Sequence, residues 1–146
     1  MSIIPQNEIP DGILKDSALA HIAAAYLSVG KKLERKTQCS ATRGFILSTL
    51  RDGTALNPNQ IATLLGLDRT VVHRAVKSLV QEGLVLEQIQ KSGRAIPIRL
   101  TAKGRKYREQ LIAARERADE SVRRKTTSEE HGTLIRLLKL IAECDF

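Results

Sequence analysis

Two short helices near the middle of the chain, each bounded by its own capping residues, constrain the fold most. The first is predicted to begin at "NPNQ", with Asn57 as N-cap, Pro58 at the first helical position and Gln60 returning a capping-box bond. The segment "GLD" then joins it to a second helix that ends at Gly83. In that segment Gly66 breaks the first helix and Asp68 caps the second. Two helices joined in this way are typical of a helix-turn-helix.

The second of these helices has two faces of opposite character. Val72, Ala75, Val76 and Leu79 recur at helical spacing and are expected to be buried. No acidic residue occurs on the other side before Glu82. That side carries Arg69, Thr70, His73, Arg74 and Lys77. The second helix of a helix-turn-helix lies in the major groove, so this face is a predicted DNA contact, while a solvated basic face explains the same pattern.

The formal net charge of +8 is concentrated in one part of the chain. Residues 69–108 hold ten Lys/Arg and two Asp/Glu, whereas the segments on either side are close to neutral. This concentration favours a polyanionic partner. The chain has two Tyr, two Phe and no Trp, which is too few for a platform that stacks single-stranded bases. Double-stranded DNA is therefore the expected partner.

A β-hairpin is predicted after the second helix. The segments "LVLEQIQ" at 84–90 and "AIPIRL" at 95–100 alternate as strands do, and "KSGR" at 91–94 is a basic turn. Pro97 lacks a backbone donor, so the second strand is expected to present that position at an unpaired edge.

Four further helices flank this region. One is expected from an Asp16 N-cap to about Arg35, and the next follows a Ser40 cap. The last two begin at Thr101 and at a capping box starting with Thr127. These helices carry more apolar surface than a small helix-turn-helix core can cover, so a homodimer interface is the economical explanation.

The expected fold class is mainly α with a small β-hairpin wing, a winged helix-turn-helix with long N- and C-terminal dimerisation helices. Residues 1–15 are predicted to form a flexible arm, and residues 16–146 a single chain unit. Within that unit, residues 37–101 form the DNA-binding lobe. Residues 16–36 and 102–146 form the dimerisation helices.

Together these elements resemble the MarR family of winged helix-turn-helix transcription regulators, over roughly residues 16–142. The resemblance is most specific at "VVHRAVKSLVQEGLV" followed by "GRAIPIRLTAKG". Ser92 stands where the family's wing has an Asp, so the carboxylate that helps to fix the wing arginine is absent. By resemblance, Arg94 would enter the minor groove. The rest of the wing pattern is matched by Arg94, Leu100, Thr101 and Gly104.

The resemblance implies a homodimeric, sequence-specific regulator of transcription that binds double-stranded DNA, a repressor on a pseudo-palindromic operator. Its two recognition helices would lie about 34–36 Å apart. It also implies release by a small aromatic or acidic effector in a crevice near Tyr26, Thr42 and Phe45, side chains that core packing explains as well. The expected DNA contacts are Arg69, Thr70, His73, Arg74, Lys77, Lys91, Ser92 and Arg94.

Other classes receive less support from the sequence. No H-E-x-x-H, G-x-S-x-G or P-loop motif is present, so we expect no enzyme, no cofactor and no metal site. No run of eighteen apolar residues and no signal peptide occurs, which favours a cytoplasmic protein with no membrane partner. Cys39 is expected as a small buried hydrophobe, with a redox-sensing thiol as the alternative. A winged-helix protein-interaction module and a non-specific architectural DNA-binding module stay open.

Overall fold

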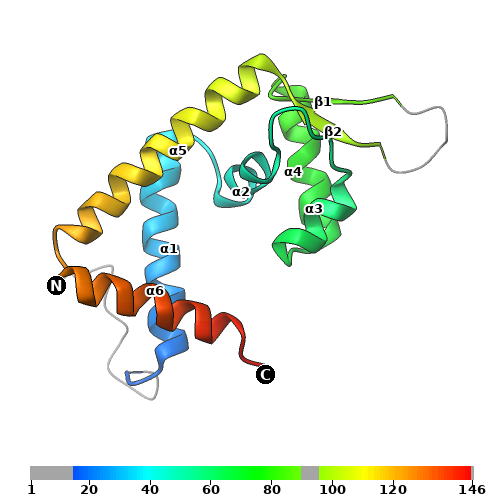
Figure 1. The fold of residues 1–146 in the computed structure, drawn as a ribbon. Helices are drawn as coiled ribbons and strands as arrows, with labels where there is room; N and C mark the ends of the chain where they lie inside the picture. Colours follow the sequence, from blue (N-terminus) through cyan, green and yellow to red (C-terminus); the bar gives the residue numbers. More distant parts are fainter. Residues whose placement is uncertain (1–14, 90–95, 146) are drawn as a thin grey trace, which may run out of the picture. The chain divides into compact units, whose positions relative to one another are not determined.

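The computed structural model describes residues 15–89 and 96–145, and it divides into two compact units after Leu111. The division falls within the helix Ala102–Arg123, and the predicted boundaries of the lobe and the dimerisation helices stay predictions. The elements in chain order are α1 (Ala18–Thr37), α2 (Ala41–Thr49), α3 (Pro58–Leu65), α4 (Arg69–Gln81), β1 (Val85–Glu87), β2 (Ile98–Leu100), α5 (Ala102–Arg123) and α6 (Ser128–Ala142) (Figure 1).

The predicted caps of the helix-turn-helix are confirmed. Asn57 and Gln60 exchange two hydrogen bonds of 2.9 Å, each from a backbone N–H to a side-chain oxygen. Gly66 ends α3 with a left-handed φ of 62°, which a side chain would make unfavourable. The prediction for α1 was wrong by one residue, because Ser17 rather than Asp16 is the N-cap and accepts from the Ala20 N–H at 3.3 Å.

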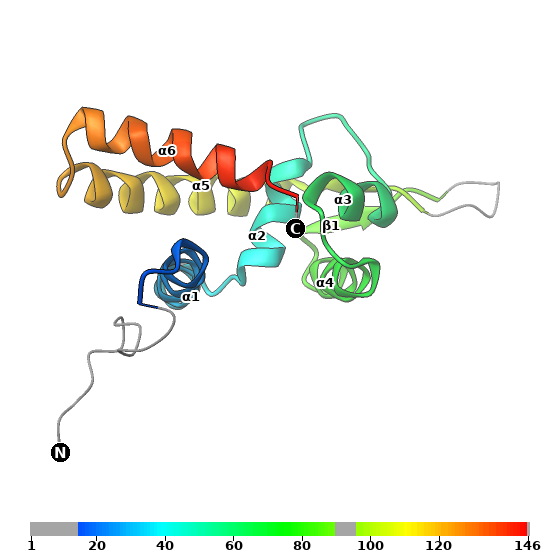
Figure 2. The same cartoon turned by 90° about the horizontal axis from the view of Figure 1, so that it is seen from below.

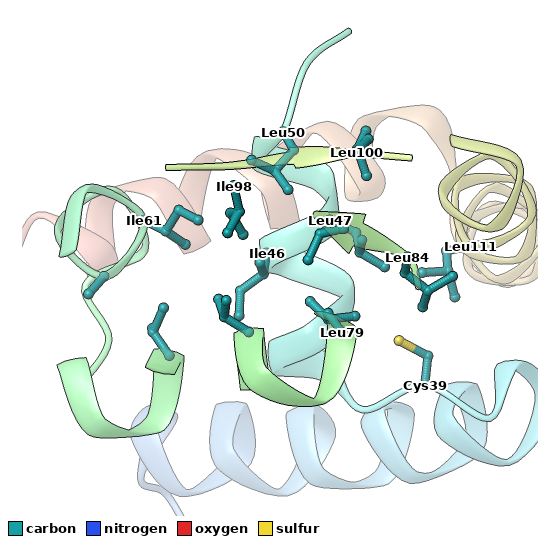
Figure 3. Packing of buried hydrophobic residues seen from close by; sticks show 14 residues of the cluster. Cys39, Ile46, Leu47, Leu50, Ile61, Leu79, Leu84, Ile98, Leu100 and Leu111 are labelled. Atoms are coloured by element: carbon teal, nitrogen blue, oxygen red, sulfur yellow. The ribbon is translucent and has the colours of Figure 1, made fainter. Parts of the chain in front are cut away.

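The first unit has a hydrophobic core between α2, α3, α4 and the hairpin. Figure 3 shows Ile46, Leu47 and Ile98 converging in this core, and all three are fully buried. Leu64 on α3 is apolar, yet it is 65% exposed. Ala62 is buried instead, because the buried arc of α3 is centred between Ile61, Ala62 and Leu65, about 100° from Leu64.

The predicted hairpin is present, with β1 and β2 antiparallel and Leu86 paired with Arg99. On its other edge, β2 is bridged to Leu56 by two backbone bonds between Leu56 and Ile98, of 2.8 and 3.1 Å. The expectation of an unpaired edge at Pro97 was wrong. The Pro97 carbonyl accepts from the Gln88 N–H on β1 at 2.8 Å, and Pro97 cannot return the bond, so the ladder weakens there.

The first turn of α5 lies against the segment that follows α4. Thr101 Oγ1 accepts from the Gly104 N–H at 2.9 Å and donates to the Gly83 carbonyl at 2.7 Å. A Cβ built on Gly104 would lie 1.8 Å from the Leu84 carbonyl oxygen. Only a residue without a side chain therefore allows this approach of two backbones.

The C-terminal end of α4 is held by charged side chains from two other helices. Arg43 on α2 donates from Nη2 to Glu82 Oε2 at 2.6 Å. Lys103 on α5 donates from Nζ to the Glu82 carbonyl at 2.7 Å. The hydrogen bond from Arg43 lowers the pKa of the Glu82 carboxyl below its ordinary value, against the opposing effect of desolvation. The end of α4 is thus tied to both α2 and α5.

The second unit consists of the rest of α5 and α6. Thr127 and Glu130 form the predicted capping box, with bonds of 3.2 and 2.7 Å. Five large apolar side chains of α6 are at least two-fifths exposed within this chain, whereas Ile141 is half-buried. The five are Leu134, Ile135, Leu137, Leu138 and Leu140.

We predict that Gly104→Ala destabilises the protein, because the new methyl group would overlap the Leu84 carbonyl and force the backbone apart. The expected loss in the free energy of unfolding is about 3 kcal/mol, measured by chemical denaturation. Gly30→Ala is the matched control. Nothing lies within 4 Å of a Cβ at that helical position, so this change should be neutral or stabilise by up to about 1 kcal/mol. Equal effects of the two changes would contradict the close approach.

We predict that Glu82→Gln lowers the free energy of unfolding by about 0.5–1 kcal/mol at pH 7. Since the folded-state pKa of Glu82 is lowered, its contribution is present above about pH 4.3, the unfolded value, and is lost as the pH falls through the folded-state pKa. The wild type and the variant should therefore converge in acid.

Denaturation at a series of pH values checks this prediction. Glu120→Gln is its control, because Glu120 pairs with Arg124 at 3.9 Å and both side chains are more than half exposed. That change should have a smaller effect. A constant difference between wild type and Glu82→Gln down to pH 2 would contradict the ionic contribution.

Candidate nucleic-acid interface

The outward face of α4 is the candidate interface. Its inward side is formed by Val72, Val76 and Leu79, which are 0–4% exposed. Because a helix repeats every 3.6 residues, burial of this stripe turns the polar residues outward. The structure leaves all five predicted contact residues of this helix exposed, namely Arg69, Thr70, His73, Arg74 and Lys77. Their role in binding DNA stays a prediction.

The start of α4 is set by Asp68. Its Oδ1 accepts from the Thr70 N–H at 2.7 Å and the Val71 N–H at 3.3 Å. These backbone bonds, that of Val71 first, lower the pKa of the Asp68 carboxyl. The ionised cap fixes where the helix begins, and hence which residues share its outward face.

Asn59 is a residue of this surface that the sequence analysis missed. In α3 it is half-buried, and its Oδ1 lies 3.1 Å from His73 Nε2 on α4. The helices α3 and α4 lie side by side in both views of the fold (Figures 1 and 2). Only this packing brings the pair together, since 14 residues separate them in the chain.

One exposed basic residue of the hairpin, Arg99, lies in the paired part of β2. Arg99 in β2 is exposed, whereas Ile98 and Leu100 on either side of it are buried. The alternation in "IRL" was a signal for this orientation, although Arg99 was not among the predicted contacts. The predicted contacts at the hairpin tip, Lys91, Ser92 and Arg94, lie outside the described residues.

The predicted effector residues lie on two helices of the first unit. Tyr26 on α1 is 57% exposed and Phe45 on α2 is 43% exposed, while Thr42 is half-buried. Their role stays a prediction.

Nearby in the same unit, Tyr107 donates from its hydroxyl to the Thr37 carbonyl at 3.1 Å. Burial first, and then the Cys39 thiol, raise the pKa of Tyr107. Cys39 is 5% exposed, as expected for a small buried hydrophobe.

Two other kinds of feature are absent from the described residues. No group of three or more His, Cys, Asp or Glu side chains there could hold a metal ion. Among the same residues, no helix combines the length and apolar composition needed to cross a membrane.

Solved structures similar to this chain share its fold. The transcriptional regulator PcaV from Streptomyces coelicolor, in complex with its natural ligand, has a TM-score of 0.79 and 18% identity, covering 93% of this chain and 99% of its own. The repressor CouR bound to a 23-mer DNA duplex has a TM-score of 0.80 and 22% identity, with the same coverage. Apo MarR from E. coli has a TM-score of 0.69 and 20% identity, covering 92% and 98%.

The sequence comparison covers a smaller part of the chain. Residues 41–95, which span α2 to the hairpin tip, match the model of the MarR family. No curated protein sequence matches the chain. The matched segment contains the helix-turn-helix, and the shared fold extends to the helices on either side of it. Residues 41–95 therefore match the MarR family, and most of the chain shares the fold of solved winged helix-turn-helix regulators, MarR from E. coli among them.

Proposed function

We propose that this protein is a sequence-specific, double-stranded DNA-binding transcription regulator, a homodimeric repressor that acts in the cytoplasm on a pseudo-palindromic operator. The observation that carries the proposal is the exposed face of α4, which has five polar or basic side chains and no acid before Glu82. Glu82 itself is paired with Arg43 at the far end of the helix. Such a face suits the major groove, where base edges and phosphates are acceptors in excess.

Different parts of the face have different proposed roles. Arg69, Thr70, His73 and Arg74, in the first half of α4, approach base edges. Lys77 and Lys91 hold phosphates, and Ser92 and Arg94 belong to a wing in the minor groove. The fold shared with CouR, which was solved bound to a DNA duplex, supports this assignment by analogy.

A second copy of the chain is the proposed partner for the exposed apolar side chains of α6. Five large apolar residues are exposed within seven positions of this helix. A contiguous apolar patch of this kind typically marks an interaction surface. A two-fold dimer would repeat α4 at the spacing of two half-sites, which is why a homodimer and a pseudo-palindromic operator belong together.

We also propose that a small aromatic or acidic effector releases the protein from DNA by binding near Tyr26, Thr42 and Phe45. Two of these side chains are substantially exposed, and an apolar ligand would cover them. The fold is shared with PcaV, whose structure contains its natural ligand.

We predict that Arg74→Ala weakens binding to a duplex from the promoter beside the protein's own gene by about tenfold or more, because a base contact is lost. Fluorescence anisotropy across a salt series measures this loss against a random duplex of the same length. The wild type should prefer the promoter by about a thousandfold, with a steep salt dependence.

Arg117→Ala is the matched control, since it removes the same charge from an exposed position of α5 in the second unit. Its affinity should stay near that of the wild type. Equal, weak binding of the wild type to both duplexes would favour the architectural alternative. No binding at low salt would favour the protein-interaction alternative.

We predict that Leu138→Glu produces a monomer, because a carboxylate would be buried unpaired in the dimer interface. Light scattering after size exclusion should give twice the chain mass of 16.2 kDa for the wild type and the chain mass for the variant. Leu64→Glu places the same charge on an exposed leucine of α3 and should stay dimeric. A wild-type monomer would refute the proposed assembly.

A further inference from the structure

One hydrogen bond between α3 and α4 joins His73, a proposed base contact, to Asn59, which has no role in the proposed function. His73 is the fifth residue of α4 and is exposed, whereas Asn59 is the second residue of α3 and is half-buried. Their side chains meet at 3.1 Å, between Nε2 of the imidazole and Oδ1 of the amide. An interhelical bond at this place holds the ring of an outward-facing histidine in one orientation.

The partner atom decides which ring nitrogen carries the proton. An amide oxygen can only accept a hydrogen bond, so Nε2 of His73 is the donor. In a neutral imidazole the other nitrogen is then an acceptor, which makes Nδ1 the atom with a lone pair. Within the described residues, no hydrogen bond to Nδ1 occurs.

The side chains around the ring differ between the two helices. The eight residues of α3 include no charged side chain, so no carboxylate of that helix faces His73. On α4 itself, the residues one turn before and after it are Arg69, Thr70 and Lys77. None of these neighbours of the ring is a carboxylate that could compete with Asn59 as its hydrogen-bond acceptor.

We propose that Asn59 is a positioning residue of the DNA interface, because it fixes the His73 tautomer whose Nδ1 accepts a hydrogen bond from an exocyclic amino group in the major groove. Adenine N6 and cytosine N4 carry such a group, whereas guanine and thymine present only acceptors there. The pair therefore selects an amino-bearing base at one position of each half-site. This inference rests on the proposed function, since it requires α4 to lie in the major groove.

Enrichment of bound duplexes from a randomised pool tests the inference with the full chain. The enriched motifs of the wild type and of His73→Ala are compared. The base position that is specified only in the wild-type motif is the one that His73 contacts. There the wild type should prefer one base pair, in one orientation, over the alternatives by about three- to tenfold. Asn59→Ala should lose this preference, because Nε2 then has no fixed acceptor and either tautomer of the ring can form.

Two further variants separate positioning from folding. Thr63→Ala removes another polar side chain from α3 and should leave the preference unchanged. In the His73→Ala background, Asn59→Ala should have no further effect on base preference, which a general disturbance of α3 would not produce.

The inference is overturned if His73→Ala removes no position from the wild-type motif, or if Asn59→Ala keeps the wild-type preference at the position that His73→Ala removes. A wild type that enriches no motif overturns the proposed function itself, and that result is distinguishable because no variant is needed to see it.

Discussion

The arrangement of the first unit depends on the burial of one side of α4. Val72, Val76 and Leu79 are almost without exposure, and they meet α2, α3 and the hairpin in one core. Removing these side chains from water supplies most of the stabilisation available to a helix of this length, since isolated short helices are marginal in water. A helix that buries this stripe has a fixed rotation about its axis. The basic side of α4 therefore faces outward, at the surface of the unit.

Both ends of α4 are held by contacts that restrict its movement along that axis. At the start, the Asp68 cap and the Asn59–His73 bond define the first turns. At the end, Arg43 and Lys103 bind the side chain and the carbonyl of Glu82. A base-reading surface needs this kind of rigidity, because side chains that are already oriented lose less entropy on binding.

The close contact between Gly104 and Leu84 links the same end of α4 to the first turn of α5. Such a contact transmits displacement, because two backbones in van der Waals contact cannot move independently. In our proposal, a ligand near α1 and α2 and an assembly through α6 act on a recognition helix that is connected to both α2 and α5. This connection is a physical basis for regulation without a ligand in the DNA interface.

The sequence by itself determined the features whose hydrogen bonds close within a few residues. The capping box of Asn57 and Gln60, the Asp68 cap and the left-handed Gly66 could be read directly, as could the amphipathic division of α4. The exact start of α1 could not be predicted in this way, because Asp16 and Ser17 are neighbouring residues of good N-cap types and only one can cap the helix. Only the tertiary structure decided the Asn59–His73 and Arg43–Glu82 contacts, whose members are 14 and 39 residues apart. It also decided the exposure of Leu64 and the pairing at Pro97. The physical reason is that such contacts depend on the angle and offset at which whole elements pack, and no local pattern of residues specifies these quantities.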